Sequence, residues 1–335
     1  MGIQPAAKLS ADGTWFTLRR VNSTTGQEYY YVYNDAVRYK RGEGSETTII
    51  DFSSTGIPYE LNTWTGEQIP IVIYTQSDES TSIPITLAGN QSTIITFVSK
   101  PPEGYPSANK HIANVSGNTL GVSVLKNGSL SVKVGPKTST PPSYTFEDGT
   151  TKTLSPSRGA PIKLINWNLT VEHWDPPNNM SDIEGDAVKH NTTHFLPHLL
   201  SWQQIPGLQN VSGRGYYSSS FHWPPCRGSA KPDGAVIDFG TIVHTLRVSV
   251  NGHVLPPLDV TAAKADISQW LVRGQNKVEA IVATPLGNVL RPIWAQLQTS
   301  GTWATDPTAG GAPPLVADYG LLQDVVITPY TNVVI

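Results

Sequence analysis

VSVNG, residues 248 to 252, and DISQWLVRGQNKV, residues 266 to 278, are the stretches that decide the fold class of this chain. In the first, apolar and polar residues alternate up to an Asn-Gly pair, which is typical of a strand that enters a tight turn. In the second, Asp266 precedes a short amphipathic segment that Gly274 ends, which predicts one helical turn. With the strand predicted from Asn276 to Thr284, the pattern indicates an all-β sandwich with one small helical insertion.

The rest of the C-terminal region consists of similar short runs. They are rich in β-branched and aromatic residues and are bounded by turn-forming residues, as strands are. The strand candidates are GYYSSSFHW (215–223), GAVIDFG (234–240), HTLRVSVNG (244–252), NKVEAIVAT (276–284) and LLQDVVITPY (321–330). We therefore expect residues 201–335 to form one β-sandwich domain.

The N-terminal region has the same character. The strand candidates there are YYYVYN (29–34), TTIIDF (47–52), IPIVIYT (69–75), SIPITLA (82–88) and STIITFVS (92–99). Strands that follow one another so closely predict a compact antiparallel unit. Residues 1–105 are the predicted first domain.

Residues 106–200 form the region between these two domains. Two alternating runs flank Lys126-Asn127-Gly128-Ser129, which predicts a hairpin. Residues 162–174 predict one long strand or a strand pair, and residues 175–199 predict a loop with at most one short helix, because Pro and Gly are frequent there. We expect a hairpin and linker region, with membership of a second sandwich as the alternative. The fold class is thus all-β, with two or three jelly-roll-like sandwich domains.

Charge and hydropathy argue against two kinds of partner. The net charge is -3 and the longest basic run is Arg38 to Arg41, so no nucleic acid partner is expected. No apolar run approaches the ~20 residues of a membrane span. The first residues, MGIQPAAKLSADGTWF, lack the features of a secretory signal. We expect either that a signal has been removed or that the chain is a piece of a longer protein.

Asn-x-Ser/Thr sequons favour an extracellular, secreted glycoprotein. Their asparagines are Asn22, Asn90, Asn114, Asn127, Asn168, Asn179, Asn191 and Asn210. Such a density is easier to explain in a eukaryotic secreted protein than by chance. Cys226 is the single cysteine, so no disulfide can form within the chain.

The C-terminal pattern resembles a known family. Ile237-Asp238-Phe239-Gly240, followed by the two stretches quoted first, is similar to the galactose-binding-like jelly roll that accompanies glycoside hydrolases. The resemblance implies that Asp266 caps the turn and that Gly274-x-Asn276 ends it. It also implies that the next strand returns into the core.

The N-terminal region resembles another part of the same enzymes. YELNTWTGEQIPIVIYTQSDESTSIPITLAGNQSTIITF, residues 59–97, is similar to the β-rich region that follows the catalytic barrel in the α-L-rhamnosidases of glycoside hydrolase family 106 and their fungal relatives. The resemblance implies a strand at Trp64-Thr65-Gly66, then a polar hairpin, and a closing strand from Leu87 to Phe97. The acid and base carboxylates of such enzymes would lie on a barrel upstream of residue 1, and no position here matches their catalytic motif.

Carboxylates are the first residues to consider for chemistry. Glu172 and Asp175 flank His173-Trp174 and are the candidate pair for glycoside hydrolysis, although spacing in the sequence cannot set the separation that this reaction needs. Asp182, Glu184 and Asp186 could offer oxygen ligands to calcium, but they do not match the calcium-loop template, so a solvated acidic loop is favoured. We expect no catalytic residue and no cofactor, with calcium as the alternative.

Histidine and cysteine side chains are the next candidates for chemistry. His190, His194 and His198 have a spacing that would align them on a helix to bind zinc, but Pro197 argues against a regular helix. Ordinary loop histidines are favoured, so no metal site is expected. Cys226, beside Arg227, is a candidate reactive thiol, with an inert unpaired thiol as the default interpretation.

Aromatic and planar polar side chains near strand ends are candidates for sugar binding, because rings stack on pyranose faces and polar groups pair with hydroxyls. The selected residues are Tyr217, His222, Trp223, Arg291 and Trp294, with Tyr216 and Trp303 nearby. As a group they predict a carbohydrate groove, whereas each one by itself is more typical of a core aromatic or structural residue.

The resemblance and the missing catalytic motif together favour a non-catalytic function. We expect an accessory, carbohydrate-binding region of a secreted glycoside hydrolase that resembles α-L-rhamnosidases. Its partners would be plant-type polysaccharide or glycan and a catalytic barrel outside this chain. The alternatives are a self-contained hydrolase with its site between the β domains, and a structural or adhesion protein.

Overall fold

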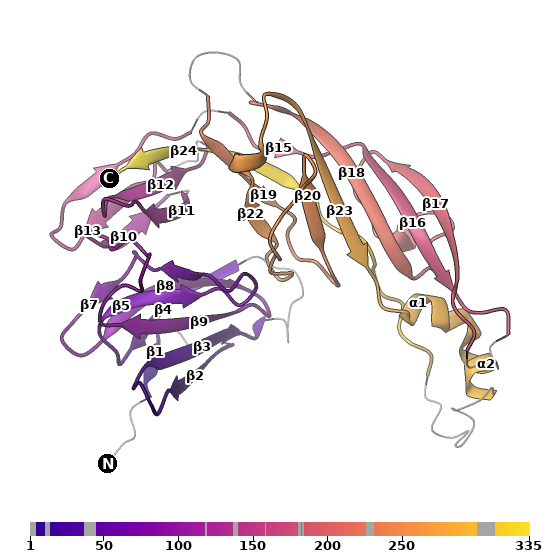
Figure 1. The fold of residues 1–335 in the computed structure, drawn as a ribbon, viewed down its shortest axis with the longest axis horizontal. Helices are drawn as coiled ribbons and strands as arrows, with labels where there is room; N and C mark the ends of the chain where they lie inside the picture. The colour runs from indigo at the N-terminus through magenta and orange to yellow at the C-terminus, as the bar shows by residue number, and fades with distance from the viewer. Residues whose placement is uncertain are drawn as a thin grey trace. The chain divides into compact units, whose positions relative to one another are not determined.

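The alternating apolar and polar residues form antiparallel sheets along the chain, which confirms the predicted all-β sandwich class (Figure 1). The structure is a computed structural model that describes residues 5–10, 14–36, 45–117, 119–136, 140–157, 159–179, 182, 184–225, 231–299 and 312–335. By packing, Met1–Pro161, Pro224–Val236 and Thr328–Ile335 make up unit 1, and Ile162–Trp223 and Ile237–Ile327 make up unit 2. The division into residues 1–105, 106–200 and 201–335 stays a prediction about domains.

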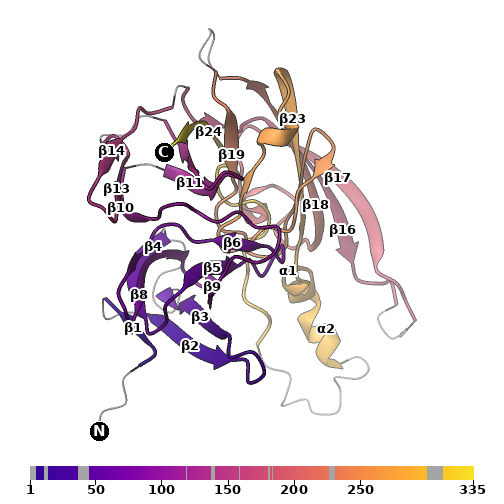
Figure 2. The same cartoon turned by 60° about the vertical axis from the view of Figure 1, so that its left-hand side comes forward.

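Unit 1 begins with two sheets that share one core (Figure 2). One sheet has the order β1-β4-β8-β7, with β1 (Ala7–Leu9), β4 (Ser45–Phe52), β8 (Thr81–Ala88) and β7 (Thr75–Gln76). The other has the order β2-β3-β9-β5-β6, with β2 (Trp15–Val21), β3 (Glu28–Asn34), β9 (Ser92–Val98), β5 (Ile57–Leu61) and β6 (Gln68–Pro70). Fully buried Tyr30 packs edge-on against Phe52 of the first sheet and Phe97 of the second, with ring centroids 4.9 and 5.8 Å away.

Two strand predictions that follow from the family resemblance are wrong in this sandwich. Trp64-Thr65-Gly66 forms the turn between β5 and β6, where Asn62 Oδ1 accepts hydrogen bonds from the backbone N–H groups of Trp64 and Thr65. Gly66 has a φ of 76°, a left-handed backbone conformation that does not occur within an extended strand. The closing strand from Leu87 to Phe97 is two strands, β8 and β9, because a turn with Asn90 at a φ of 65° separates them.

The second part of unit 1 has a smaller core of its own. Its strands are β10 (Ile112–Ser116), β13 (Ser143–Phe146) and β14 (Thr151–Thr153) in one sheet, and β11 (Thr119–Val124) and β12 (Leu130–Val134) with the end of β24 (Val326–Val334) in another. The predicted Asn-Gly hairpin is confirmed, because β11 and β12 pair across a turn in which Gly128 has a φ of 82°.

Unit 2 contains a sheet with the order β17-β16-β18-β23-β20-β21. These strands are β16 (Trp167–Asp175), β17 (Val188–Leu196), β18 (Gly213–Trp223), β20 (Arg247–Val250), β21 (His253–Val254) and β23 (Gly274–Ala283). Strand β15 (Ile162–Lys163) pairs with β24. Strands β19 (Gly234–Asp238) and β22 (Lys264–Asp266) follow β24 in the strand order, and β19 begins in unit 1 and ends in unit 2. The short helices are η2 (Trp202–Gln204), η3 (Ser268–Trp270), α1 (Gly287–Leu290), η4 (Arg291–Ile293) and α2 (Trp294–Thr299).

The stretch DISQWLVRGQNKV forms the turn that its residues imply. Asp266 Oδ1 accepts a 2.9 Å hydrogen bond from the backbone N–H of Ser268, which begins the short 3₁₀ helix η3. Gly274 has a φ of 104° and starts β23, which runs back into the core. Fully buried Asn276 accepts from the Val272 N–H and donates to the carbonyl oxygens of Val272 and Gly274. The predicted cap and turn ending are thus confirmed.

The prediction of a loop over residues 175–199 is wrong for the second half of this range. Residues 188–196 form β17, and each of its nine residues pairs with one residue of β16. The loop prediction weighted Pro and Gly, but these lie before residue 186 and at Pro197, which bound the strand rather than interrupt it. The same pairing shows that residues 162–174 contain one long strand, preceded by the two-residue β15.

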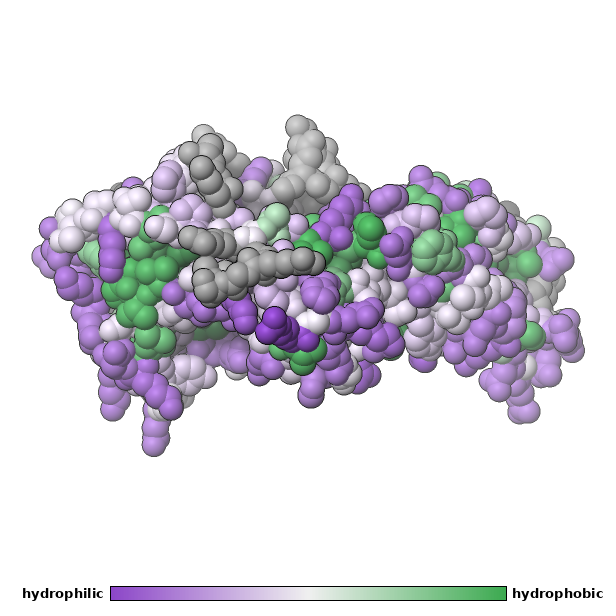
Figure 3. All heavy atoms as spheres, turned by 90° about the horizontal axis from the view of Figure 1, so that it is seen from above, coloured by the Kyte–Doolittle hydropathy of each residue, from purple (hydrophilic) through white to green (hydrophobic). Residues whose placement is uncertain are grey.

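No helix among the described residues is long and apolar enough to cross a membrane. Figure 3 shows one face of the molecule, on which hydrophobic residues form separate patches among hydrophilic ones.

Candidate functional site

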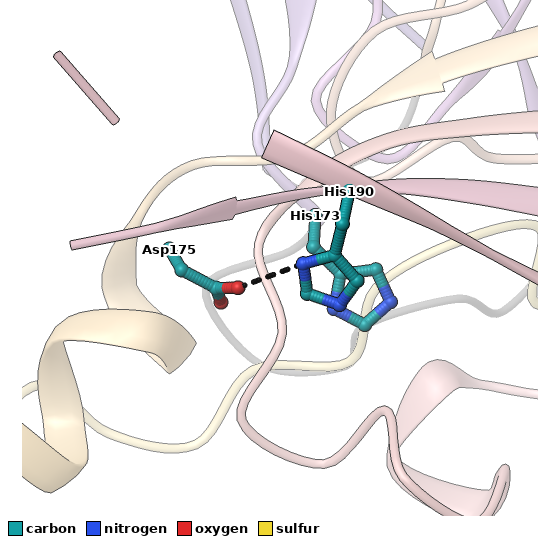
Figure 4. Close-up of side chains that lie close together, drawn as sticks. All are labelled: His173, Asp175 and His190. Atoms are coloured by element: carbon teal, nitrogen blue, oxygen red, sulfur yellow. Dashed lines mark ion pairs between the residues drawn. The ribbon is translucent and has the colours of Figure 1, made fainter. Parts of the chain in front are cut away.

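Strands β16 and β17 bring two histidines and an aspartate together at one end of the unit 2 sheet (Figure 4). His173 and Asp175 are two residues apart in β16, so their side chains lie on the same face of the sheet. His190 of β17 is the direct cross-strand partner of His173. The antiparallel register therefore places all three side chains on one face.

The contacts within this cluster are close. Asp175 Oδ2 lies 3.1 Å from His190 Nδ1, and the His190 ring stacks on the His173 ring with centroids 4.2 Å apart and planes at 28°. One ligand atom from each of the three residues lies within 4.8 Å of the other two. His173 is buried, with 5% of its surface exposed, whereas the side chains of His190 and Asp175 are 51% and 37% exposed.

Thr192 and His194 extend the cluster along β17. The Thr192 hydroxyl lies 2.8 Å from His173 Nε2 and 3.0 Å from His194 Nε2, so it bridges the two rings. Burial lowers the pKa of His173, and the neighbouring His190 lowers it further, while Asp175 acts in the opposite direction. The His173 ring is therefore held neutral more readily than an exposed histidine.

The cluster differs from the candidate set of His190, His194 and His198. His190 and His194 do share a face, but on a strand, where residues four apart also align. His198 follows Pro197 and lies outside β17, so it does not belong to this group. His173 and Asp175 complete the cluster, and only a His-x-Asp pattern in β16 could have indicated them.

The candidate carboxylate pair is not brought together. Glu172 and Asp175 are three residues apart on β16, so they point to opposite faces of the sheet. Glu172 Oε1 accepts a 2.6 Å hydrogen bond from Trp174 Nε1. Lys189 and Arg214 lie over the Trp174 ring at 4.7 and 5.2 Å from its centroid. Two carboxyl groups on opposite faces of one sheet cannot flank the same glycosidic bond.

The residues predicted to bind sugar are scattered within unit 2. Tyr217 and Trp223 lie on the buried face of β18, with 2% and 8% of their surfaces exposed, so their rings are not available to stack on a pyranose. His222 is exposed on the other face of the same strand. Arg291 in η4 and Trp294 at the start of α2 are half-buried, and Arg291 Nη1 donates to the Pro314 carbonyl at 3.3 Å. Sugar binding by this set stays a prediction.

Tyr217 is fixed by partners that the sequence did not indicate. Its hydroxyl accepts a 2.7 Å hydrogen bond from Trp202 Nε1 and a 3.3 Å one from the Leu321 N–H. Burial raises the pKa of Tyr217 to about 12. These contacts assign Tyr217 to the core of unit 2.

The remaining candidates are exposed or lie outside the described residues. Asp182, Glu184 and Asp186 are exposed, and Asp182 Oδ1 accepts from the Glu184 N–H at 3.1 Å, so calcium binding there stays a prediction. Cys226 and Trp303 lie outside the described residues. All of the sequon asparagines are exposed: Asn22, Asn90, Asn114, Asn127, Asn168, Asn179, Asn191 and Asn210.

Comparison with known proteins identifies one similarity of fold. No family model and no curated protein matches the chain. The chain is similar to a solved rhamnosidase from Novosphingobium sp. PP1Y, with a TM-score of 0.55 and 18% identity over 97% of this chain and 25% of that one. It also aligns with a beta-glucuronidase from Faecalibacterium prausnitzii over 53% of this chain and 33% of that one, at 17% identity and a TM-score of only 0.30. The chain thus spans about a quarter of the rhamnosidase, with which it shares a fold.

Proposed function

We propose that this chain is a non-catalytic, carbohydrate-associated region of a secreted glycoside hydrolase related to α-L-rhamnosidases. The observation that carries the proposal is the rhamnosidase likeness, because 97% of this chain aligns with only 25% of that enzyme. An all-β region of this size within a larger glycosidase is suited to support a catalytic domain or to bind glycan. Fold alone does not determine function, so the assignment needs a direct test.

The separation of Glu172 from Asp175 supports the non-catalytic assignment. A glycosidase of the usual kind needs two carboxyl groups on either side of the scissile bond. The candidate pair lies on opposite faces of β16, and Glu172 accepts a hydrogen bond from Trp174. These two carboxylates therefore give no support to the alternative of a self-contained hydrolase.

An assay of the purified chain tests this proposal. We expect no hydrolysis of an aryl α-L-rhamnoside and slower migration in affinity gels that contain rhamnose- or galactose-rich plant polysaccharide. His222→Ala should weaken the retardation if the predicted sugar-binding set is used, because His222 is the exposed member of that set. Trp64→Ala is the matched control, since Trp64 is an exposed aromatic in unit 1.

Turnover that disappears in Glu172→Gln or Asp175→Asn would contradict the non-catalytic assignment. Retardation without turnover supports the glycan-binding form of the proposal. Absence of both turnover and retardation would exclude glycan binding and leave either support of a catalytic domain or the structural and adhesion alternative.

A further inference from the structure

We propose that His173, Asp175 and His190 form a binding site for a divalent first-row transition metal ion such as Zn²⁺. Two imidazole nitrogens and one carboxylate oxygen are a donor set that suits zinc, iron, nickel or copper. Calcium and magnesium prefer oxygen ligands alone, so this site would select against them. The proposal rests on the side-chain geometry and does not depend on the proposed function.

The separation of the donor atoms fits a small metal ion. Bonds of 2.0–2.1 Å at tetrahedral angles put neighbouring ligand atoms about 3.3 Å apart. The 3.1 Å between Asp175 Oδ2 and His190 Nδ1 is close to this value. The third donor, from His173, lies within 4.8 Å of both others. The remaining adjustment falls on His190 and Asp175, whose exposed side chains can rotate.

Thr192 provides the outer hydrogen bond that a ligating histidine needs. A metal-bound imidazole usually donates its second ring N–H to a neighbouring oxygen, which fixes the tautomer and the ring orientation. His173 Nε2 lies 2.8 Å from Thr192 Oγ1, and no other hydrogen bond to His173 occurs among the described residues. When Nε2 donates to Thr192, the lone pair of His173 Nδ1 is left for the metal ion.

The site is open to solvent and carries a suitable charge. Half of the His190 side chain and more than a third of the Asp175 side chain are exposed, so an ion and a bound water molecule have access. Asp175 supplies the negative charge. Lys189 and Arg214 lie over the Trp174 ring, and Trp174 belongs to the opposite face of β16. They therefore do not compete for Asp175.

Calorimetric titration of the chelator-stripped chain with ZnCl₂ tests the proposal. We expect saturable binding of one Zn²⁺ per chain that excess CaCl₂ does not displace, together with a melting temperature that rises with the logarithm of the free Zn²⁺ concentration once the site is filled. Co²⁺ should give a visible absorption band typical of a protein-bound ion, which Zn²⁺ abolishes by competition.

Variants distinguish this site from adventitious binding to surface histidines. His190→Gln and Asp175→Asn, whose side chains are exposed and tolerate replacement, should each weaken Zn²⁺ binding by more than the loss of an outer hydrogen-bond partner, which costs about 10- to 100-fold. Thr192→Val should weaken it by about 10- to 100-fold, as expected of an outer hydrogen-bond partner. His198→Gln is the control, because His198 is exposed and lies outside β17.

The absence of saturable Zn²⁺ binding would overturn the proposal. Unchanged affinity in both His190→Gln and Asp175→Asn would do the same, as would an equal loss in His198→Gln. The rhamnoside assay has no bearing on these results, so failure of the metal site and failure of the proposed function are separate outcomes.

Discussion

The Tyr217 hydroxyl is a hydrogen-bond acceptor inside the core of unit 2. Trp202 Nε1 and the Leu321 N–H both donate to it, so Tyr217→Phe leaves two donors without a partner. Because each unpaired buried donor costs about 1–3 kcal/mol, we expect the two together to lower the free energy of unfolding by about 2–6 kcal/mol. Urea denaturation followed by tryptophan fluorescence measures the loss.

Tyr216→Phe is the matched control for this substitution. Tyr216 is the next residue of β18, and its side chain lies on the opposite, partly exposed face. Its replacement should change the stability little. A loss in Tyr216→Phe as large as that in Tyr217→Phe would show that the hydrogen bonds to Trp202 and Leu321 are not the cause.

His244 makes the stability of unit 2 depend on pH. Burial lowers the pKa of His244 below its usual 6.5, so the unfolded chain binds this proton more readily than the folded chain. The contribution of neutral His244 to stability should therefore be fully present above pH 6.5. It should be lost as the pH falls from 6.5 through the folded-state pKa. His244 Nε2 is buried without a hydrogen-bond partner among the described residues, and the ring packs edge-on against Tyr319 at 4.9 Å.

A comparison of His244→Gln with the parent chain isolates this contribution. Urea denaturation at pH 7.5 and pH 5.5 should show a smaller difference in the variant, because glutamine does not titrate. The variant will keep part of the pH dependence, since burial lowers the pKa of His173 as well. Identical slopes in the two proteins would exclude His244 as a source of acid sensitivity.

At the scale of an element, Asn276 joins the turn before β23 to the hairpin after β20. Its Oδ1 accepts from Val272 and from Asn251 Nδ2, and its Nδ2 donates to two carbonyl oxygens. Asn276→Leu removes all of these bonds from a fully buried position, so we expect a loss of about 2–4 kcal/mol in the free energy of unfolding. Chemical denaturation measures it, and exposed Gln275→Ala in the same strand should be nearly neutral.

Strand β17 shows why local composition was insufficient to predict an element. HNTTHFLPHLL contains no alternation of apolar and polar residues, because most of β17 is exposed on both faces. Its conformation is set by nine pairs with β16, which lies between β17 and β18 in the sheet. Such an edge strand is stabilised by backbone pairing with a distant segment, and a window of neighbouring residues does not contain that information.

At the scale of the molecule, the exposed sequons allow a test of the predicted secretion route. We expect the chain to carry N-linked glycans when it is produced through a eukaryotic secretory pathway, because all of the sequon asparagines are exposed. Asn210 and Asn179, which lie outside strands, should be occupied more fully than Asn168 within β16. Peptide mapping after endoglycosidase treatment gives the occupancy, and the same chain from bacterial cytoplasm is the control. An unmodified secreted product would contradict this prediction.

The residues by themselves determined the fold class, most of the strands, the Asn-Gly hairpin and the cap and turn of DISQWLVRGQNKV. Each of these depends on side-chain alternation or on bonds between residues close in the chain, such as Asp266 to Ser268 and Asn276 to Val272. Only the tertiary structure decided that Tyr217 is a core residue and that Glu172 and Asp175 point apart. It alone placed His190 beside His173 and Asp175, because a cross-strand neighbour depends on the register between two strands, and one residue of slip would turn every side chain to the other face.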